Sequence, residues 1–492
     1  MTSKFTLLSS LRLWLVCPVT SYRRFVLGLA TAVAVVAGGG AYVVQQRDPA
    51  PPAARPGASA TPTGSPLPTV APVAERTPAA YASPPASGAE ALPEAVARAL
   101  AAPFADEALG ARVNAMVADA ATGATLYDRN AHAGVVPAST TKLFTAVAAL
   151  RALGPDRRLP TRIVTAGTVA SGTLTGDLVV VGGGDPTLTD NAGVSPYPQP
   201  ARLADLARQV RAKGITRVTG RVVVDASLFG GARLGPGWKP TYVTEGSVAP
   251  VTAFEVDGGR PRHDASDARV QRPDLTGGAK LAAALRRAGV AVGTTVTTGG
   301  APATATELAL VESPPVSALV ERLLIRSDND LAEALARHVA IERRLTPDFA
   351  GAAQAVTDVL RDLGVDPPVL YDASGLSRLD RIAPAQMVAV LATATREQSL
   401  APVIAGLPVA AFTGTLASRY TKAPATAAAG RVRAKTGSLD NVATLAGVVE
   451  TASGRVLVFA FAADRLPTRF VGAAARALDV AATALARCGC AA

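Results

Sequence analysis

The sequence predicts an α+β fold, in which an antiparallel sheet has helices on its faces and carries inserted, strand-rich subdomains. Strand-like runs open and close the globular part of the chain: 112–118, 124–129, 442–450 and 456–463. Between them, residues 316–324 and 331–341 repeat apolar side chains at helical spacing. Strands at both ends around a helical middle favour one sheet that the two ends of the chain complete. A further strand-rich stretch, 161–305, interrupts this order and predicts the inserted subdomains.

Composition places the chain among globular proteins with a sizeable core. It has 492 residues, of which 49% are hydrophobic and 18% are charged, and its net charge is +11. The arginines are scattered through Ala-rich segments, and no motif supports a nucleic-acid partner, so we expect none. The positive charge instead favours attraction to an anionic cell envelope.

Few residues are suited to metal or disulfide chemistry. None of the three histidines, at positions 132, 263 and 338, has the spacing of metal ligands, so we expect no metal and no other cofactor. A hydrolase built on this sequence would use a base other than histidine. Cys488 and Cys490 could oxidise or bind a metal, although a frayed tail is the more frequent role of such a pair.

The N-terminal region predicts export from the cytoplasm. Residues 1–24 carry only positive charges and form a cytoplasmic segment, and residues 25–44 are an apolar run long enough to span a bilayer. The run is either a transmembrane anchor or a signal peptide, because the small residues 37–41 could supply a cleavage site. Residues 45–91 form a flexible Pro/Ala-rich linker. The rest of the chain is therefore expected in the cell envelope, either anchored or secreted.

The globular part is expected to contain one discontinuous domain, 92–160 with 306–492, interrupted by the subdomains at 161–305. Inside the insertion, two segments repeat the order helix, glycine, strand and begin at residues 203 and 280. A triple glycine at 182–184 follows a strand-like run. It lacks the spacing of a dinucleotide or phosphate loop, so a tight turn is its expected role.

A predicted helix start at residue 137 brings a serine and a lysine together. Pro137 precedes small hydroxylic residues, and an apolar stripe at helical spacing follows them. Ser139 and Lys142, three residues apart, share one face of the first turn, so the amine can reach the hydroxyl. Such a pair can turn an unreactive hydroxyl into a nucleophile.

Two further motifs follow in order. Ser327-Asp328-Asn329 lies between two predicted helices, and Lys435-Thr436-Gly437 lies on a predicted strand. With Ser139-x-x-Lys142 they resemble the signature of penicillin-binding proteins and serine β-lactamases. The long insertion and three shorter stretches, 182–188, 372–378 and 414–416, narrow the resemblance to the class C low-molecular-mass penicillin-binding proteins. These are the D-alanyl-D-alanine carboxypeptidases/endopeptidases of the peptidase S13 family, and the similarity runs from about residue 92 to the C-terminal helix.

The resemblance implies a β-lactamase/transpeptidase-like catalytic domain that acts on peptidoglycan stem peptides and is inhibited by β-lactams. Ser139 would attack the carbonyl between two D-alanines, with Lys142 as the base and Ser327 as the proton relay. Asn329 would hold the substrate amide. Lys435 and Thr436 would meet the terminal carboxylate, which predicts an exposed cation on an edge strand.

The resemblance also implies roles for residues that surround the bond to be cleaved. The backbone N–H groups of Ser139 and Ser438 would form the oxyanion hole. Gly437 would let the substrate lie close to the strand, and Arg378 is a candidate for specificity. The run from Gly237 to Tyr242 lacks the carboxylate that the family uses to meet a diamino-acid ammonium.

Two other readings stay open at this stage. A serine β-lactamase would need a deacylating carboxylate after the Ser-Asp-Asn loop, and no convincing Glu-x-x-x-Asn follows it. A non-catalytic envelope protein that binds peptidoglycan or penicillin would not need all of Ser139, Lys142, Ser327, Asn329 and Lys435.

Overall fold

The computed structural model describes residues 91–191, 193, 197–263, 268–468 and 471–489, all of which belong to the unit that begins at Ala74. The predicted cytoplasmic segment, the apolar run at 25–44 and all but the last residue of the linker lie outside the described residues. None of the helices among the described residues is long and apolar enough to cross a membrane.

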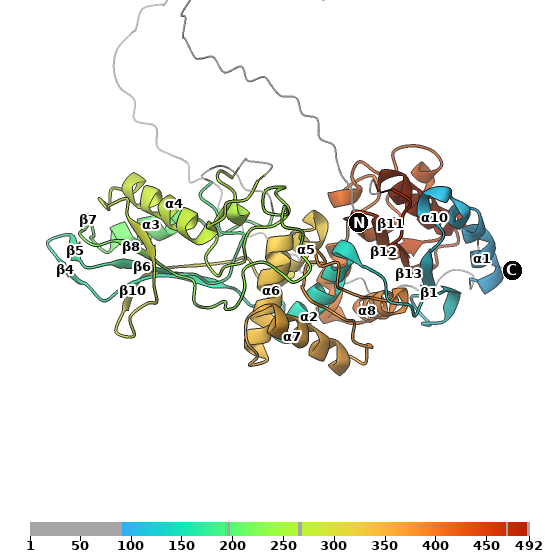
Figure 1. Cartoon of the computed structure of the whole chain (residues 1–492), viewed down its shortest axis with the longest axis horizontal. Helices are drawn as coiled ribbons and strands as arrows, with labels where there is room; N and C mark the ends of the chain where they lie inside the picture. Colours follow the sequence, from blue (N-terminus) through green and yellow to red (C-terminus); the bar gives the residue numbers. More distant parts are fainter. Residues whose placement is uncertain (1–90, 192, 194–196, 264–267, 469–470, 490–492) are drawn as a thin grey trace, which may run out of the picture. The chain divides into compact units, whose positions relative to one another are not determined.

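A five-stranded antiparallel sheet joins the two ends of the described chain (Figure 1). Its strands are β1 (Asn114–Asp119), β2 (Thr125–Arg129), β11 (Val432–Leu439), β12 (Val442–Glu450) and β13 (Val456–Ala463). Their order is β11-β12-β13-β1-β2, and β13 pairs with β1 in the register Asn114 to Ala462. The predicted sheet, completed by both ends of the chain, is therefore confirmed, and β11 forms one edge of it.

Side chains alternate between the two faces of this sheet and pack on different helices. On one face, Val448 and Val458 join the core beneath α8 (Pro384–Arg396). On the other face, Leu445 and Phe459 pack with α10 (Gly472–Arg487) and α1 (Pro93–Ala101). This two-sided burial explains why β12 and β13 read as nearly continuous apolar runs rather than alternating ones.

The core on the α8 side extends into a group of helices around α2 (Lys142–Leu153). Residues 142–150 of α2 are all buried, because helices cover it on several sides. Those helices are α5 (Val316–Arg326), α6 (Asn329–Glu342), α7 (Phe349–Asp362), α8 and α9 (Ala401–Ala405). The first residue of α2 is thereby fixed in a rigid core. Cys488, which follows α10, is disulfide-bonded, and Cys490 lies outside the described residues.

A second, mixed sheet has the order β10-β3-β6-β8-β9. Its strands are β3 (Pro160–Thr165), β6 (Leu178–Val181), β8 (Val222–Asp225), β9 (Val296–Thr298) and β10 (Thr306–Glu312), and it packs with α3 (Leu203–Ala212) and α4 (Pro273–Arg287). A small sheet contains β4 (Thr168–Ala170), β5 (Thr173–Thr175) and β7 (Arg217–Val218). Strand β10 carries the second sheet past residue 305, where the sequence placed the end of the insertion; the division into domains stays a prediction.

The triple glycine at 182–184 forms a close-packed turn after β6. A Cβ on Gly183 would lie 1.9 Å from the carbonyl oxygen of Pro160, and one on Gly182 would lie 2.5 Å from that of Ala253. Glycine is thus required at these positions because other segments of the backbone pass too close for a side chain. This agrees with the predicted tight turn.

Candidate active site

Ser139 and Lys142 meet where a 3₁₀ turn enters α2. Ser139 lies in the turn η3 (Ala138–Thr141), one turn earlier than the helix proper, and Ala138 adopts a positive φ of 48°. The Nζ atom of Lys142 donates a hydrogen bond to Ser139 Oγ at 3.1 Å. The predicted contact between amine and hydroxyl is present, although the turn and not an α-helix presents the serine.

Lys142 is fully buried, and three oxygens surround its amine. Besides Ser139 Oγ, Nζ donates to Asn329 Oδ1 at 2.5 Å and to the carbonyl of Ser374 at 2.6 Å. Burial lowers the pKa of Lys142 to about 8, against the opposing charges of Asp372 and Glu333. The neutral form that a general base requires is therefore far more populated near physiological pH than in an ordinary lysine, although the charged form still predominates.

The Ser-Asp-Asn motif forms the junction between α5 and α6. Ser327 ends α5 in the left-handed conformation with φ 55°, and Asp328 caps α6 by accepting the N–H of Leu331 at 3.1 Å. Asn329 is the first residue of α6 and donates from Nδ2 to the carbonyl of Ser247 at 2.8 Å. Because that bond engages the amide nitrogen, the amide oxygen faces Lys142.

Lys435 on β11 pairs with the second serine of the site. Its amine donates to Ser327 Oγ at 2.9 Å and to the carbonyl of Thr436 at 2.8 Å. The expectation of an exposed cation is wrong, since Lys435 is 0% exposed. Burial, together with the charge of Lys142, holds the pKa of Lys435 well below its usual range. The site thus contains two serine-lysine pairs.

The three residues after Lys435 differ in their surroundings. Thr436 Oγ1 lies 2.8 Å from Thr415 Oγ1, and Ser438 is exposed. A Cβ on Gly437 would lie 2.1 Å from Thr444 Oγ1 and 2.7 Å from the carbonyl oxygen of Pro137. Gly437 therefore allows β11 to approach the turn that carries Ser139, a reason that differs from the expected approach of substrate.

A loop at 372–378 closes the site behind Lys142. Asp372 organises it, accepting the N–H groups of Gly375 and Ser377 and the indole N–H of Trp238, each at 2.7 Å. Gly375 has a φ of 79°, and a Cβ there would lie 1.9 Å from the carbonyl oxygen of Ala138. The loop is thus packed directly against the turn that presents Ser139.

Glu333 is a site residue that the sequence analysis missed. Its Oε1 accepts the N–H groups of Ala373 at 3.0 Å and Ser374 at 2.9 Å, and its Oε2 accepts from Arg337 at 3.2 Å. Burial, reinforced by the charge of Asp372, raises the pKa of Glu333 to about 7. A carboxylate four residues after Asn329, flanked by apolar residues of the same helix, was the available signal.

Part of the predicted site lines a pocket of about 610 Å³. Ser139, Asn329, Arg378 and Ser438 line it directly. Lys142 lies behind this surface and donates hydrogen bonds to Ser139 and Asn329, whereas Ser327 and Lys435 bond to each other and do not line the pocket. Arg378 is exposed and donates to the carbonyl of Asp440 at 2.8 Å.

The insertion supplies one wall of the pocket. Gly237, Lys239, Tyr242, Glu245 and Ser247 line it from that side. The sequence predicted no carboxylate here, yet Glu245 reaches the pocket and pairs with Lys239 at 2.9 Å. Among the described residues, no three His, Cys, Asp or Glu side chains are arranged to hold a metal ion.

Comparison with known proteins agrees with this geometry. The sequence profile of the D-Ala-D-Ala carboxypeptidase 3 (S13) family matches residues 96–267 and 260–485. Carboxypeptidase Rv3627c of Mycobacterium tuberculosis is 37% identical over 416 residues, which cover 82% of this chain and 87% of the relative. Carboxypeptidase DacB of Mycolicibacterium smegmatis is 38% identical over 405 residues, which cover 80% and 84%.

A crystal structure of penicillin binding protein 4 (dacB) from Haemophilus influenzae has the same fold. It superposes with a TM-score of 0.64 at 24% identity and covers 74% of this chain and 94% of its own. The profile match spans both parts of the predicted catalytic domain and the insertion between them, and hydrogen bonds from Lys142 to Asn329 and from Lys435 to Ser327 link the three motifs. The chain belongs to the D-Ala-D-Ala carboxypeptidase 3 (S13) family.

Proposed function

We propose that this protein is a serine D,D-peptidase that acts on peptidoglycan stem peptides and is inhibited by β-lactams. It cleaves the D-Ala-D-Ala bond, or the D-Ala-diamino acid bond of a cross-link, through an acyl-enzyme on Ser139. The hydrogen bond of 3.1 Å between Lys142 and Ser139 carries this proposal, because it joins a partly exposed hydroxyl to a buried amine of lowered pKa.

Acylation begins with neutral Lys142. The amine accepts the proton of Ser139 Oγ as the oxygen attacks the carbonyl carbon of the penultimate D-alanine. The carbonyl oxygen becomes an oxyanion, which the backbone N–H groups of Ser139 and Ser438 stabilise. Asn329 holds the substrate amide while its Oδ1 keeps the amine of Lys142 in place.

The second serine-lysine pair completes the step. When the C–N bond breaks, Ser327 relays to the leaving nitrogen the proton that Lys142 took from Ser139, so Lys142 is neutral again, while the amine of Lys435 holds Ser327 Oγ at 2.9 Å. The leaving D-amino acid departs as a free amine. Water then attacks the ester on Ser139 as neutral Lys142 accepts its proton, and Lys142 returns that proton to Ser139 Oγ when the C–O bond breaks and the shortened peptide leaves.

Substrate recognition uses the C-terminal end of β11. Thr436 and Ser438 donate hydroxyl hydrogen bonds to the terminal carboxylate, and Arg378, which is hydrogen-bonded to Asp440 just past the end of the same strand, contacts the stem peptide. A β-lactam enters the same cycle, because its ring carbonyl acylates Ser139 while its carboxylate takes the place of the terminal one.

We further propose that the chain works in the cell envelope. The apolar run at 25–44 either anchors it in the membrane or is cleaved during export, and the linker holds the catalytic domain at a distance from the bilayer.

The full-length protein tests this function when it is incubated with a muropeptide monomer that ends in D-Ala-D-Ala. We expect free D-alanine to accumulate with the wild type and not with Ser139→Ala. Equal release by both proteins would overturn the proposal.

A further inference from the structure

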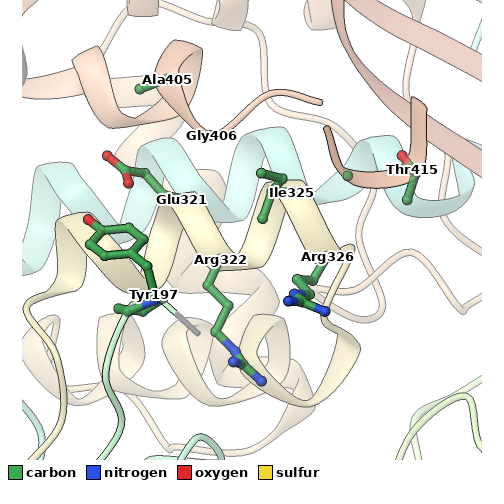
Figure 2. Close-up of a pocket in the computed structure, with 10 residues that line it drawn as sticks. Tyr197, Glu321, Arg322, Ile325, Arg326, Ala405, Gly406 and Thr415 are labelled. Carbon is green, nitrogen blue, oxygen red and sulfur yellow. The ribbon is translucent and has the colours of Figure 1, made fainter. Parts of the chain in front are cut away.

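A second pocket, of about 500 Å³, adjoins the reacting groups (Figure 2). Arg326, which directly precedes Ser327, lines it, and so does Thr415, whose hydroxyl lies 2.8 Å from that of Thr436. Neither Arg326 nor Thr415 lines the pocket that contains Ser139. The second pocket is therefore separate from the first, and it lies next to Ser327 through Arg326 and next to Thr436 through Thr415.

Two cations from one helix border this pocket. Arg322 and Arg326 lie four residues apart on α5, a spacing at which like charges repel each other across one helical turn. Arg322 Nε donates to Asp328 Oδ2 at 3.3 Å. For Arg326, whose side chain is exposed, the described residues provide no hydrogen bond or ion pair. Arg322 thus has a carboxylate partner and Arg326 has none among the described residues, so the pocket retains positive charge.

Glu321, the one acidic residue among those that line the pocket, interacts with Tyr197 and not with the arginines. Burial raises the pKa of Glu321, and its carboxyl is hydrogen-bonded to the hydroxyl of Tyr197. Figure 2 shows Glu321 and Tyr197 together at one side of α5, with both guanidinium groups directed away from that carboxyl. An anion that enters the pocket would therefore meet the arginines.

We propose that this pocket binds the leaving-group side of the substrate, and that Arg326, with Arg322, pairs with a second carboxylate there. The inference rests on the proposed function, in which Ser327 protonates the leaving nitrogen and Thr436 holds the adjacent carboxylate. The remainder of the leaving group must extend past these two residues. The second pocket lies beside both of them.

The size and charge of the pocket select among leaving groups. Free D-alanine carries one carboxylate, which Thr436 already holds, and its single methyl group leaves most of about 500 Å³ unfilled. A leaving group that is itself a stem peptide carries further carboxylates and a longer chain. The substrate class that fits the pocket is therefore a cross-linked peptide dimer.

The test compares two substrates on the full-length protein. The kcat/KM is measured for a muropeptide dimer, with cleavage of the cross-link as readout, and for a monomer that ends in D-Ala-D-Ala. We expect Arg326→Gln to lower the ratio of dimer to monomer kcat/KM by about five-fold, as the loss of one charge-assisted contact predicts. Arg326→Glu should lower the ratio further, because it reverses the charge.

Arg98→Gln is the matched control, since Arg98 is an exposed arginine on α1, which lines neither pocket. It should leave the ratio at the wild-type value. An unchanged ratio in Arg326→Glu, in a protein that still binds benzylpenicillin covalently, would overturn the inference. Absence of D-alanine release by the wild type would instead contradict the proposed function, so the two failures are distinguishable.

Discussion

Asn329 and Glu333 lie one turn apart on α6 and hold Lys142 from two directions. Asn329 accepts directly from the amine at 2.5 Å. Glu333 acts through the backbone, because it accepts the N–H groups of Ala373 and Ser374, and the carbonyl of Ser374 then accepts from the same amine at 2.6 Å. One helix thus fixes the position of the base, and the buried ion pair with Arg337 on the same helix holds the Glu333 carboxylate in place.

The lowered pKa of Lys142 predicts the pH dependence of acylation. A folded-state pKa of about 8 means that the neutral, reactive amine increases as pH rises through that value. We expect the second-order rate of acylation by benzylpenicillin to rise between pH 6 and pH 9 with a midpoint near 8. A rate that does not change over this range would argue against Lys142 as the base.

Removing the charge of Glu333 should shift this profile. The carboxylate raises the pKa of Lys142, so its loss lowers that pKa and moves the midpoint to lower pH. In Glu333→Gln, the amide oxygen still accepts from the loop, but Arg337 loses its ionic partner. We expect a loss of stability of about 3 kcal/mol because a buried charge is left unpaired.

Glu342→Gln provides the control, because Glu342 is exposed at the last residue of the same helix. Its acylation profile and its unfolding midpoint should match those of the wild type. A midpoint that stays in place in folded Glu333→Gln would contradict the positioning role of Glu333 and leave it a purely structural residue.

Gly437→Ala should damage both fold and activity. The added methyl group would lie 2.1 Å from Thr444 Oγ1 and 2.7 Å from the carbonyl oxygen of Pro137, so β11 must move away from the turn of Ser139. Overpacking of this kind costs about 2 kcal/mol, and denaturant unfolding should report it alongside a slower acylation.

A glycine in open space supplies the comparison. A Cβ on Gly293 would meet no atom within 4 Å, so Gly293→Ala should change neither stability nor acylation appreciably. Wild-type acylation by Gly437→Ala would show that the close approach of β11 to the turn does not matter for the reaction.

The sequence was sufficient where local pattern decides the structure. Apolar periodicity located α2, α5 and α6, and the apolar runs near the C-terminus located β12 and β13. The spacing of Ser139 and Lys142 predicted their contact because a turn and a helix both place residues three apart on one face.

What the sequence could not provide depends on contacts between distant segments. Glu333 and Asp372 act through a loop whose packing on Ala138 is set by tertiary structure. Lys435 carries a charge, which predicts exposure, but the hydroxyl of Ser327, 108 positions away, allows its burial. Glu245 enters the pocket because the chain of the insertion turns back after Tyr242, which the local sequence does not specify.

Intact-mass spectrometry of the full-length protein after incubation with benzylpenicillin tests the central claim most directly. We expect a stable adduct of one penicillin on the wild type and none on Ser139→Ala. No adduct on the wild type while penicillin stays intact would indicate a non-catalytic binding protein. Rapid loss of penicillin without a lasting adduct would indicate a β-lactamase, and either result would contradict the account.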